Sequence, residues 1–261
     1  MTKEPRWTVI TGASSGIGAE LARAFAARGS ALVLAARRHE RLEALSREIQ
    51  AAHGVPVEVM ALDLEDRAAP QDLCEMLRER GIVPHTLVNN AGFGLRGRFA
   101  TLPHERQIAM IDLNVTALTA LCRLMLPGMI ERGRGGILNV ASTAAFQAGP
   151  YMAVYYATKA FVLSLSEALH EEAKPHGVTV TALCPGPTES EFSATADLEN
   201  SKLFKGGAMP AADVARLGVD GYERGRAIVI TGRTNLLGTI GAKVFPRSMT
   251  RRIAGLLQGG G

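Results

Sequence analysis

Three side chains in the middle of the chain have the types and spacing needed to move a proton: Ser142, Tyr155 and Lys159. Tyr155 and Lys159 lie four residues apart in a segment that reads as helix, so both project from one helical face. Ser142 closes the apolar stretch 136–142, which we expect to be a strand. An ammonium group favours the phenolate form of a nearby tyrosine, and a hydroxyl can hydrogen-bond a substrate oxygen. The trio therefore predicts interconversion of a carbonyl and an alcohol, with the hydride supplied from elsewhere.

A glycine-rich turn near the N-terminus predicts a site for a phosphate-bearing cofactor. The strand expected over residues 7–11 runs into this turn, and an amphipathic helix follows it. Glycine lets the backbone approach an anion closely, while the N–H groups and the dipole of a helix N-terminus attract it. The spacing Gly-x-x-x-Gly-x-Gly departs from the dinucleotide fingerprint Gly-x-Gly-x-x-Gly. We expect cofactor contacts from Gly12, Ser14, Ser15, Gly16, Ile17 and Gly18.

Taken in order along the chain, a set of motifs resembles the short-chain dehydrogenase/reductase family over roughly residues 7–232. One such motif alone is weak evidence, whereas the complete ordered set is highly specific. The motifs are Thr11-Gly12-x-x-x-Gly16-x-Gly18, Asp63-Leu64, Asn89-Asn90-Ala91-Gly92, Asn114, Ser142, Tyr155-x-x-x-Lys159 and Pro185-Gly186-Pro187-Thr188.

The resemblance implies a role for each motif residue. Tyr155 would be the general acid and base, and Ser142 would bind the carbonyl oxygen. Lys159 would lower the tyrosine pKa and hold the nicotinamide ribose, while Asn114 would disturb its helix and hold a water that resupplies protons. As an alternative, Asn114 is a polar residue on a solvent-facing side. Further cofactor contacts are implied for Asp63, Leu64, Asn90, Ala91, Gly92, Pro185, Gly186 and Thr188.

Two of these assignments have a competing interpretation in the sequence itself. Tyr156 lies three residues before Lys159, a spacing that also allows contact, and only the family spacing selects Tyr155. We expect Tyr156 to pack or to line the pocket. Asp63 would contact the adenine by resemblance, but Asp is also a favoured helix N-cap.

The residues after the second expected strand predict the choice between NAD and NADP. An acidic residue there accepts hydrogen bonds from a ribose 2′-OH, whereas an arginine accommodates a 2′-phosphate. Ala36, Arg37 and Arg38 occupy this place, and two guanidinium groups suit a phosphate. We expect NADP(H), with Arg37 as the main contact and Arg38 in support. Alternatively both are solvated helix-start residues, and either cofactor is tolerated. The glycine loop holds Ser14 and Ser15 where many NADP-using relatives carry a basic residue.

Strand-like and helix-like segments alternate along the chain, which predicts one α/β domain over residues 1–261. We expect a Rossmann-type doubly wound parallel sheet of about seven strands with helices on both faces. Strands are expected at 7–11, 31–35, 55–62, 86–89, 136–142, 178–183 and 227–230, and helices at 38–52, 66–80, 103–132, 155–174 and 211–223. Pro127 should kink or end the long helix early. Residues 188–210 read as a mobile surface loop, which the resemblance places over the substrate.

Composition disfavours several other classes of protein. The net charge of +4 is mild and the aromatic content of 5% is low, so a nucleic-acid partner is not expected. The three cysteines and six histidines lack the spacing of a disulfide framework or a metal site. The charged N-terminus does not read as a signal peptide, and no run of 18 apolar residues is present. We therefore expect a cytoplasmic protein without a metal.

The last stretch, residues 234–261, is a basic and partly amphipathic tail interrupted by Pro246. It could cover the substrate pocket, mediate oligomerisation or contact an anionic membrane. We favour packing or subunit contact in a homodimer or homotetramer, and disfavour membrane contact because Pro246 interrupts the helix.

The function expected overall is an NADP(H)-dependent reductase or dehydrogenase acting on a small carbonyl compound or its alcohol. A fold shared with a family does not fix function, so two alternatives stay open. One is a non-catalytic NADP-binding regulator, against which the intact trio argues. The other is an epimerase or dehydratase on the same fold, which the trio does not exclude.

Overall fold

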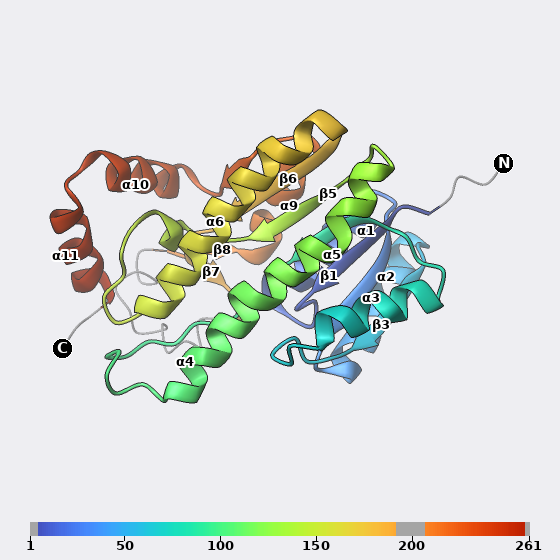
Figure 1. Cartoon of the computed structure of the whole chain (residues 1–261), viewed down its shortest axis with the longest axis horizontal. Helices are drawn as coiled ribbons and strands as arrows, with labels where there is room; N and C mark the ends of the chain where they lie inside the picture. The colour runs from blue at the N-terminus through green and yellow to red at the C-terminus, as the bar shows by residue number, and fades with distance from the viewer. Residues whose placement is uncertain (1–4, 192–206, 259–261) are drawn as a thin grey trace.

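A single parallel sheet of seven strands forms the centre of the molecule, with a layer of helices on each side (Figure 1). The computed structural model describes residues 5–191 and 207–258. The strand order is β3-β2-β1-β4-β5-β6-β9, and the doubly wound α/β fold expected from the sequence is confirmed. The strands are β1 Trp7–Thr11, β2 Ala31–Ala36, β3 Val57–Ala61, β4 Pro84–Asn89, β5 Gly135–Val140, β6 Val178–Cys184 and β9 Ile228–Ile230.

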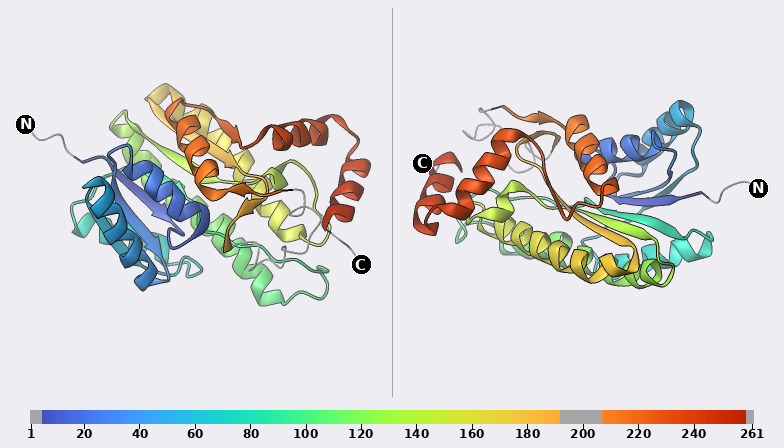
Figure 2. Two further views of the ribbon diagram at one scale, coloured as in Figure 1. Left: turned by 180° about the vertical axis from the view of Figure 1, so that it is seen from behind. Right: turned by 90° about the horizontal axis from the view of Figure 1, so that it is seen from above.

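The helices divide between the two faces of the sheet, as the view from above in Figure 2 shows. One face is covered by α3, α4, α5 and α6, and the other by α1, α2 and α9. These helices are α1 Gly16–Ala26, α2 His39–His53, α3 Ala69–Glu79, α4 His104–Ile111, α5 Leu118–Glu131, α6 Ala153–Ala173 and α9 Ala211–Glu223. The expected bounds differ from the observed ones by at most three residues.

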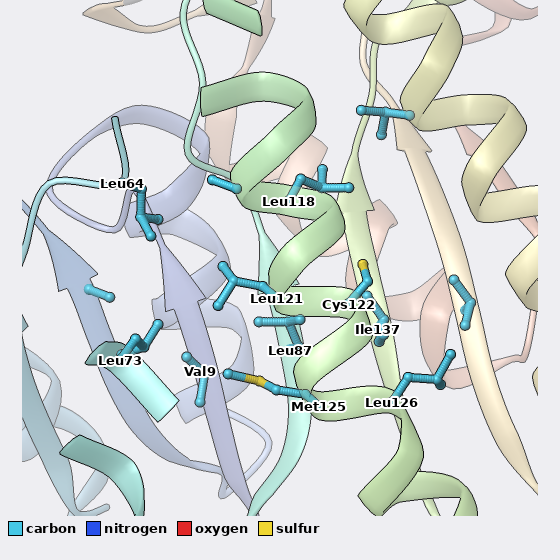
Figure 3. Packing of buried hydrophobic residues seen from close by; sticks show 14 of the residues in the cluster. Val9, Leu64, Leu73, Leu87, Leu118, Leu121, Cys122, Met125, Leu126 and Ile137 are labelled. Carbon is cyan, nitrogen blue, oxygen red and sulfur yellow. The ribbon is translucent and has the colours of Figure 1, made fainter. Parts of the chain in front are cut away.

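Each strand carries apolar residues on both sides because the sheet is buried on both faces. Val9 and Leu87 belong to the core under α5, whereas their neighbours Ile10 and Val88 belong to the core under α1 and α2. All four are fully buried. Figure 3 shows the first of these cores, with Leu121 and other α5 side chains packed over the strands. Continuous apolar strands of this kind are typical of parallel sheets.

The strand order reverses next to β1, and this reversal creates the place for a ligand. Strand β1 pairs in parallel with both β2 and β4. Strands β2 and β3 therefore lie on one side of β1, and the later strands lie on the other. In open parallel sheets, ligands bind beyond the carboxyl ends of the strands at such a switch point. Gly12, Asp63, Asn90, Ser142 and Pro185 each follow closely after a strand at this edge.

The long helical run from His104 to Glu131 has an irregular middle. Residues Asp112–Ala117 form a π-helical turn between α4 and α5, and Asn114 lies inside it. The expected local disturbance at Asn114 is therefore confirmed. Of the two outcomes expected at Pro127, a kink or an early end, the early end is wrong, because α5 continues to Glu131.

By length and mean hydropathy alone, this run is also long and apolar enough to cross a membrane. Its residues Leu118, Leu121 and Met125 are buried against the sheet, however, as in the core helix of a globular domain. We therefore interpret it as a core element.

Two segments beyond the sheet bear on the site. The short parallel pair β7 Thr188–Glu189 and β8 Met209–Pro210 flanks the expected substrate loop, of which residues 192–206 lie outside the described residues. The tail forms two helices, α10 Arg233–Val244 and α11 Arg247–Gln258, separated at Pro246 as the sequence predicts. Short 3-10 turns occupy Thr143–Phe146 and Lys174–His176.

Candidate active site

One cavity of about 640 Å³ lies at the carboxyl edge of the sheet and brings together almost every residue expected in the site. The glycine loop, both arginines, the residues after β3 and β4, the proton-transfer trio and the segment after β6 all line it. Two expected site residues do not: Gly18 and Asn114 lie behind its wall. Gly18 packs against Gly12, and Asn114 is hydrogen-bonded to Phe93; both of these partners line the cavity.

The glycine loop has the close packing and the backbone conformations that require glycine. Gly12 and Gly16 have φ values of +64° and +54°, a region that side chains rarely adopt. A Cβ on Gly12 would lie 2.8 Å from Cα of Ala91. A Cβ on Gly18 would lie 2.3 Å from the carbonyl oxygen of Gly12, so Gly18 lets helix α1 pack against the loop. Gly16 and Ile17 at the start of α1 line the cavity, and amide groups at a helix N-terminus favour the binding of a phosphate group.

Hydrogen bonds between β1 and β4 fix this loop to the neighbouring strand. The Thr11 hydroxyl accepts from the backbone N–H groups of Asn90 and Ala91 at 3.0 and 3.1 Å. The Asn90 side chain donates to the carbonyl oxygens of Thr11 and Gly12 at 3.0 and 3.1 Å. The side-chain amide of Asn90 thus ties the two strand ends together.

The two arginines after β2 point to different places. Arg38 donates to the hydroxyls of Ser14 at 3.0 Å and of Ser15 at 2.7 Å, so its guanidinium lies beside the glycine loop. Arg37 instead donates to Glu65 at 3.0 Å and has its Nη1 3.6 Å from a carboxylate oxygen of Asp63. Of the two, Arg38 is the one held beside the phosphate cradle. The guanidinium of Arg38 thus provides a positive charge beside the glycine loop, which itself holds Ser14 and Ser15 in place of a basic residue.

Glu191 lies on the far side of the same guanidinium. Its carboxylate accepts from Arg38 at 2.8 Å and is also paired with Arg41. Hydrogen bonds from these two arginines lower the pKa of Glu191 to about 2. Arg38 is therefore shared between the glycine loop and an acid at the start of the expected substrate loop.

The residues after β3 form the cavity wall near these arginines. The Asp63 carboxylate accepts from the backbone N–H of Glu65 at 3.0 Å. Because α3 begins only at Ala69, Asp63 is not the N-cap of that helix, and this alternative is wrong. Leu64 is buried in the core and also lines the cavity.

The proton-transfer trio meets at the other end of the cavity. Ser142 follows β5, and Tyr155 and Lys159 come from the first two turns of α6. Ser142 is hydrogen-bonded with the Tyr155 phenol, and its hydroxyl accepts from the Ala144 N–H at 3.1 Å. The Nζ of Lys159 donates to the carbonyl oxygen of Val140 at 2.8 Å and lies 5.8 Å from the centre of the Tyr155 ring. The convergence expected from the spacing is present.

Burial dominates the electrostatics of this pair. It lowers the pKa of Lys159 to about 8, because desolvation disfavours the ammonium form. It raises the pKa of Tyr155, and the hydrogen bond with Ser142 offsets part of that rise. The direction for Tyr155 differs from the sequence expectation, in which Lys159 lowers the tyrosine pKa, and burial is the largest cause of the rise.

Asn114 supports the trio from behind. Its side-chain amide donates to the carbonyl oxygen of Phe93 at 3.0 Å and to the Thr158 hydroxyl at 3.2 Å, and it accepts from the Phe93 N–H at 3.1 Å. A Cβ on Gly92 would lie 2.8 Å from Oδ1 of Asn114 and 3.7 Å from Nζ of Lys159. Asn114 is almost fully buried, so the interpretation as a solvent-facing residue is wrong.

The segment after β6 is packed against the tail. Thr188 donates to the carbonyl oxygen of Gly186 at 2.9 Å, and the carbonyl oxygen of Pro185 accepts from the Thr143 N–H at 2.9 Å. A Cβ on Gly186 would lie 2.3 Å from the side chain of Asn235 in α10. Glycine at position 186 of the Pro185-Gly186-Pro187-Thr188 motif therefore leaves room for the side chain of Asn235.

The tail also contributes residues to the cavity that motif reasoning did not assign. Gln258, at the end of α11, is buried and donates to the Tyr156 hydroxyl at 2.9 Å. Its carbonyl oxygen accepts from the Arg96 guanidinium at 2.9 Å. Tyr156 thus packs and lines the pocket as expected, while the tail covers the pocket, a role that the sequence left open. The tail residues lining the cavity are Thr234, Asn235, Gly238, Thr239, Ala242, Ile253, Leu257 and Gln258.

Known proteins with similar sequences and structures are oxidoreductases. The family model for short chain dehydrogenases matches residues 6–201. The chain is 40% identical to sulfoacetaldehyde reductase of Chromohalobacter salexigens, over 79% of this chain and 83% of that protein. A short-chain dehydrogenase of Sphingobium yanoikuyae in complex with NADPH has a TM-score of 0.82 and 35% identity, over 91% of this chain and 93% of that one.

A structure with the other cofactor is also similar. A short-chain dehydrogenase/reductase of Burkholderia phymatum in complex with NAD has a TM-score of 0.80 and 26% identity, over 90% of this chain and 92% of that one. The extent of the family match and the identities leave one assignment: this chain belongs to the short-chain dehydrogenase/reductase family and is an oxidoreductase that acts on carbonyl or alcohol groups.

Proposed function

We propose that the protein is an NADP(H)-dependent reductase that interconverts a small carbonyl compound and its alcohol, with Tyr155 as the general acid and base. The observation that carries this proposal is the geometry of one cavity. It joins the trio of Ser142, Tyr155 and Lys159 at one end to the glycine loop and Arg38 at the other.

The residues at the chemical end have separate tasks. A bound nicotinamide would supply the hydride, or accept it in the reverse direction. Ser142 would hydrogen-bond the carbonyl oxygen, where negative charge develops. Tyr155 donates the proton to that oxygen, and its raised pKa keeps the phenol protonated at neutral pH. Lys159 would hold the nicotinamide ribose and, with Asn114 and water, resupply the proton.

NADP(H) is the proposed cofactor, with the two arginines in the reverse order of the sequence prediction. Arg38 is the main 2′-phosphate contact because it already lies beside Ser14 and Ser15. Arg37 takes the supporting role, because Glu65 and Asp63 hold its guanidinium. The NADPH complex at 35% identity supports this choice, although a relative at 26% identity is in complex with NAD.

We further propose a cytoplasmic homodimer or homotetramer. Exposed apolar side chains on the outer faces of α4, α5 and α6, among them Ile108, Leu124 and Phe161, are suited to subunit contact. The three cysteines are free thiols, as a reducing compartment would keep them.

The test follows NADPH oxidation across a panel of aldehydes and ketones. With a good substrate, Tyr155→Phe should lower turnover by about 100- to 10,000-fold and leave NADPH binding intact. The matched control is Tyr156→Phe, which removes a hydroxyl whose partner is Gln258 and should keep most of the activity. Near-normal turnover by Tyr155→Phe would refute the mechanism. NADPH binding with no turnover of any substrate would favour a regulator instead.

A further inference from the structure

The two tail helices, α10 and α11, together form the end of the molecule farthest from the N-terminus (Figures 1 and 2). Their outer surface is unusually apolar. Of the fifteen large hydrophobic side chains exposed in the described chain, nine lie in these helices and the turn between them. They include the most exposed of all, Val244 at 75%, Leu256 at 71% and Leu237 at 69%. The nine are Leu236, Leu237, Ile240, Val244, Phe245, Met249, Ile253, Leu256 and Leu257.

The same segment is strongly basic. Residues 233–258 contain five arginines and lysines and no aspartate or glutamate. None of the five forms an ion pair with an acid in residues 5–191 or 207–258, in contrast to Arg23 and Arg28, which are each paired with two carboxylates. All five are exposed: Arg233, Lys243, Arg247, Arg251 and Arg252.

Helical spacing places the exposed apolar residues on one side of each helix. In α10, Leu236, Ile240 and Val244 recur every four residues, while Asn235 and Thr239 face the cavity. In α11 the exposed set is Met249, Ile253 and Leu256, while its buried set is Thr250, Ala254 and Gln258. Pro246 separates the two helices, and each of them has its own exposed apolar side.

Side-chain contacts attach both ends of the tail to the rest of the described chain. Gln258 anchors the end of α11 through its bonds with Tyr156 and Arg96. Asn235 anchors the start of α10 by donating to the carbonyl oxygen of Thr231 at 2.7 Å and by packing on Gly186.

We propose that the outer face of α10 and α11 docks on the surface of an anionic lipid bilayer. Helices that combine exposed leucines with arginines and lysines bind in the plane of such surfaces. A second copy of the chain fits this face less well, because a two-fold contact would bring together two sets of five basic side chains that have no ion-pair partner among the described residues. The sequence disfavoured membrane contact because of Pro246, and the two separate helices remove that objection.

The docked orientation would bring the mouth of the cavity to the bilayer. Ile253 and Leu257 are exposed on the proposed docking face and also line the cavity. Resting on the proposed reductase function, this continuity favours an amphiphilic carbonyl compound with an apolar chain as the substrate. Such a compound partitions into the bilayer and would reach Tyr155 from that side.

The docking is tested by sedimentation with vesicles, a readout that needs no catalytic turnover. The full chain is mixed with vesicles of phosphatidylcholine alone or with 30% phosphatidylglycerol, at roughly 50 and 500 mM salt; at the lower salt the Debye length exceeds 10 Å. We expect binding to the anionic vesicles at low salt, and weaker binding at high salt or without the anionic lipid. No binding to anionic vesicles at low salt would refute the proposal.

Two pairs of variants test whether vesicle binding depends on this surface or on exposed charged and apolar side chains anywhere on the protein. Arg251→Gln/Arg252→Gln should weaken vesicle binding by about tenfold or more, against the control Arg47→Gln/Arg224→Gln on the exposed surface elsewhere. Leu237→Ser/Leu256→Ser should also weaken it by tenfold or more, against Phe99→Ser, which is similarly exposed at 65%. Equal losses in the tail variants and their controls would overturn the proposal.

Two further measurements distinguish the other outcomes. Analytical ultracentrifugation without lipid tests whether a second copy of the chain covers this face instead. If Leu237→Ser/Leu256→Ser turned a dimer into a monomer, the proposal that a bilayer covers the face would be refuted. NADPH oxidation with a water-soluble aldehyde should be unchanged in the leucine variant, because neither leucine lines the cavity. Docking and the reductase function can therefore fail independently.

Discussion

Lys159 carries its charge where burial opposes it, and the consequence is a measurable dependence of stability on pH. Its side chain is almost fully buried, and burial lowers its pKa from 10.5 to about 8. The unfolded chain keeps this proton up to about pH 10.5, whereas the folded chain releases it near pH 8. Between these values the unfolded state binds more protons, so the free energy of unfolding rises with pH. The destabilisation is therefore complete below pH 8 and disappears towards pH 10.5.

The size of the effect follows from the pKa shift. The two pKa values differ by roughly 2.5 units, which corresponds to about 3 kcal/mol. Lys159→Met removes the buried ammonium at every pH, and it also removes the hydrogen bond to Val140. The lost hydrogen bond adds an offset that changes little with pH. We subtract the free energy of unfolding of the wild type from that of Lys159→Met at each pH. This difference should therefore fall by about 3 kcal/mol from pH 7.5 to pH 10.5.

The assay is equilibrium unfolding in urea at fixed protein concentration, repeated at four pH values. The control is Lys174→Met, which removes an exposed lysine and should give a difference that changes by less than about 0.5 kcal/mol. Burial raises the pKa of Tyr155, and that of Cys184 to about 12, so these neighbours stay protonated over most of the range. A difference that stays flat for Lys159→Met, or that rises with pH, would refute the reasoning.

Three further predictions concern the cofactor site and its support. Arg38→Ala should weaken NADPH binding about tenfold or more and leave NADH binding unchanged, whereas Arg37→Ala should cost NADPH threefold or less; fluorescence titration measures both, and equal losses would contradict the assignment. Glu191→Gln weakens a competitor for Arg38 and should raise NADPH affinity about threefold, whereas unchanged affinity would argue against competition. Gly92→Ala places a methyl group 2.8 Å from Oδ1 of Asn114 and should cost about 1–3 kcal/mol in chemical unfolding. Wild-type stability in that variant would show that Asn114 moves aside.

The architecture was predictable because its signals are local and repeated. Buried parallel strands read as continuous apolar runs, and each is followed by a helix of regular spacing. The end of each strand then carries the motif, so the order of motifs along the chain predicts a common edge. Asn114 shows the same logic within a helix, because an amide among apolar residues indicated a local irregularity that the π-helical turn confirms.

The orientation of neighbouring identical side chains was not predictable in this way. Arg37 and Arg38 are equivalent in the sequence, and the turn between β2 and α2 decides where each one points. Arg38 is the N-cap of α2, with φ of −87° and ψ of 83°, and its side chain turns back to the glycine loop. Arg37 is drawn to acids 26 and 28 residues further along the chain, a pairing that only the fold creates.

The role of the tail was undetermined for a related reason. Gln258 contacts Tyr156 and Arg96 across 102 and 162 residues, and no periodicity in the sequence relates positions that far apart. Hydropathy alone showed a basic, partly amphipathic segment, for which packing or a subunit contact was favoured over a lipid surface because of Pro246. The fold distinguishes between its two sides, since it buries Gln258 against the pocket and leaves Leu256 in solvent.

The pKa of Tyr155 shows that the sequence can identify the residues of a site without predicting the balance of electrostatic effects among them. Spacing alone places an ammonium beside a phenol, and from that pair a lowered tyrosine pKa follows. Spacing carries no information on how much water the fold removes from both groups. In the structure, desolvation raises the pKa of Tyr155 and lowers that of Lys159 to about 8. The lysine is thus in place as expected, yet burial sets the direction of the tyrosine pKa shift.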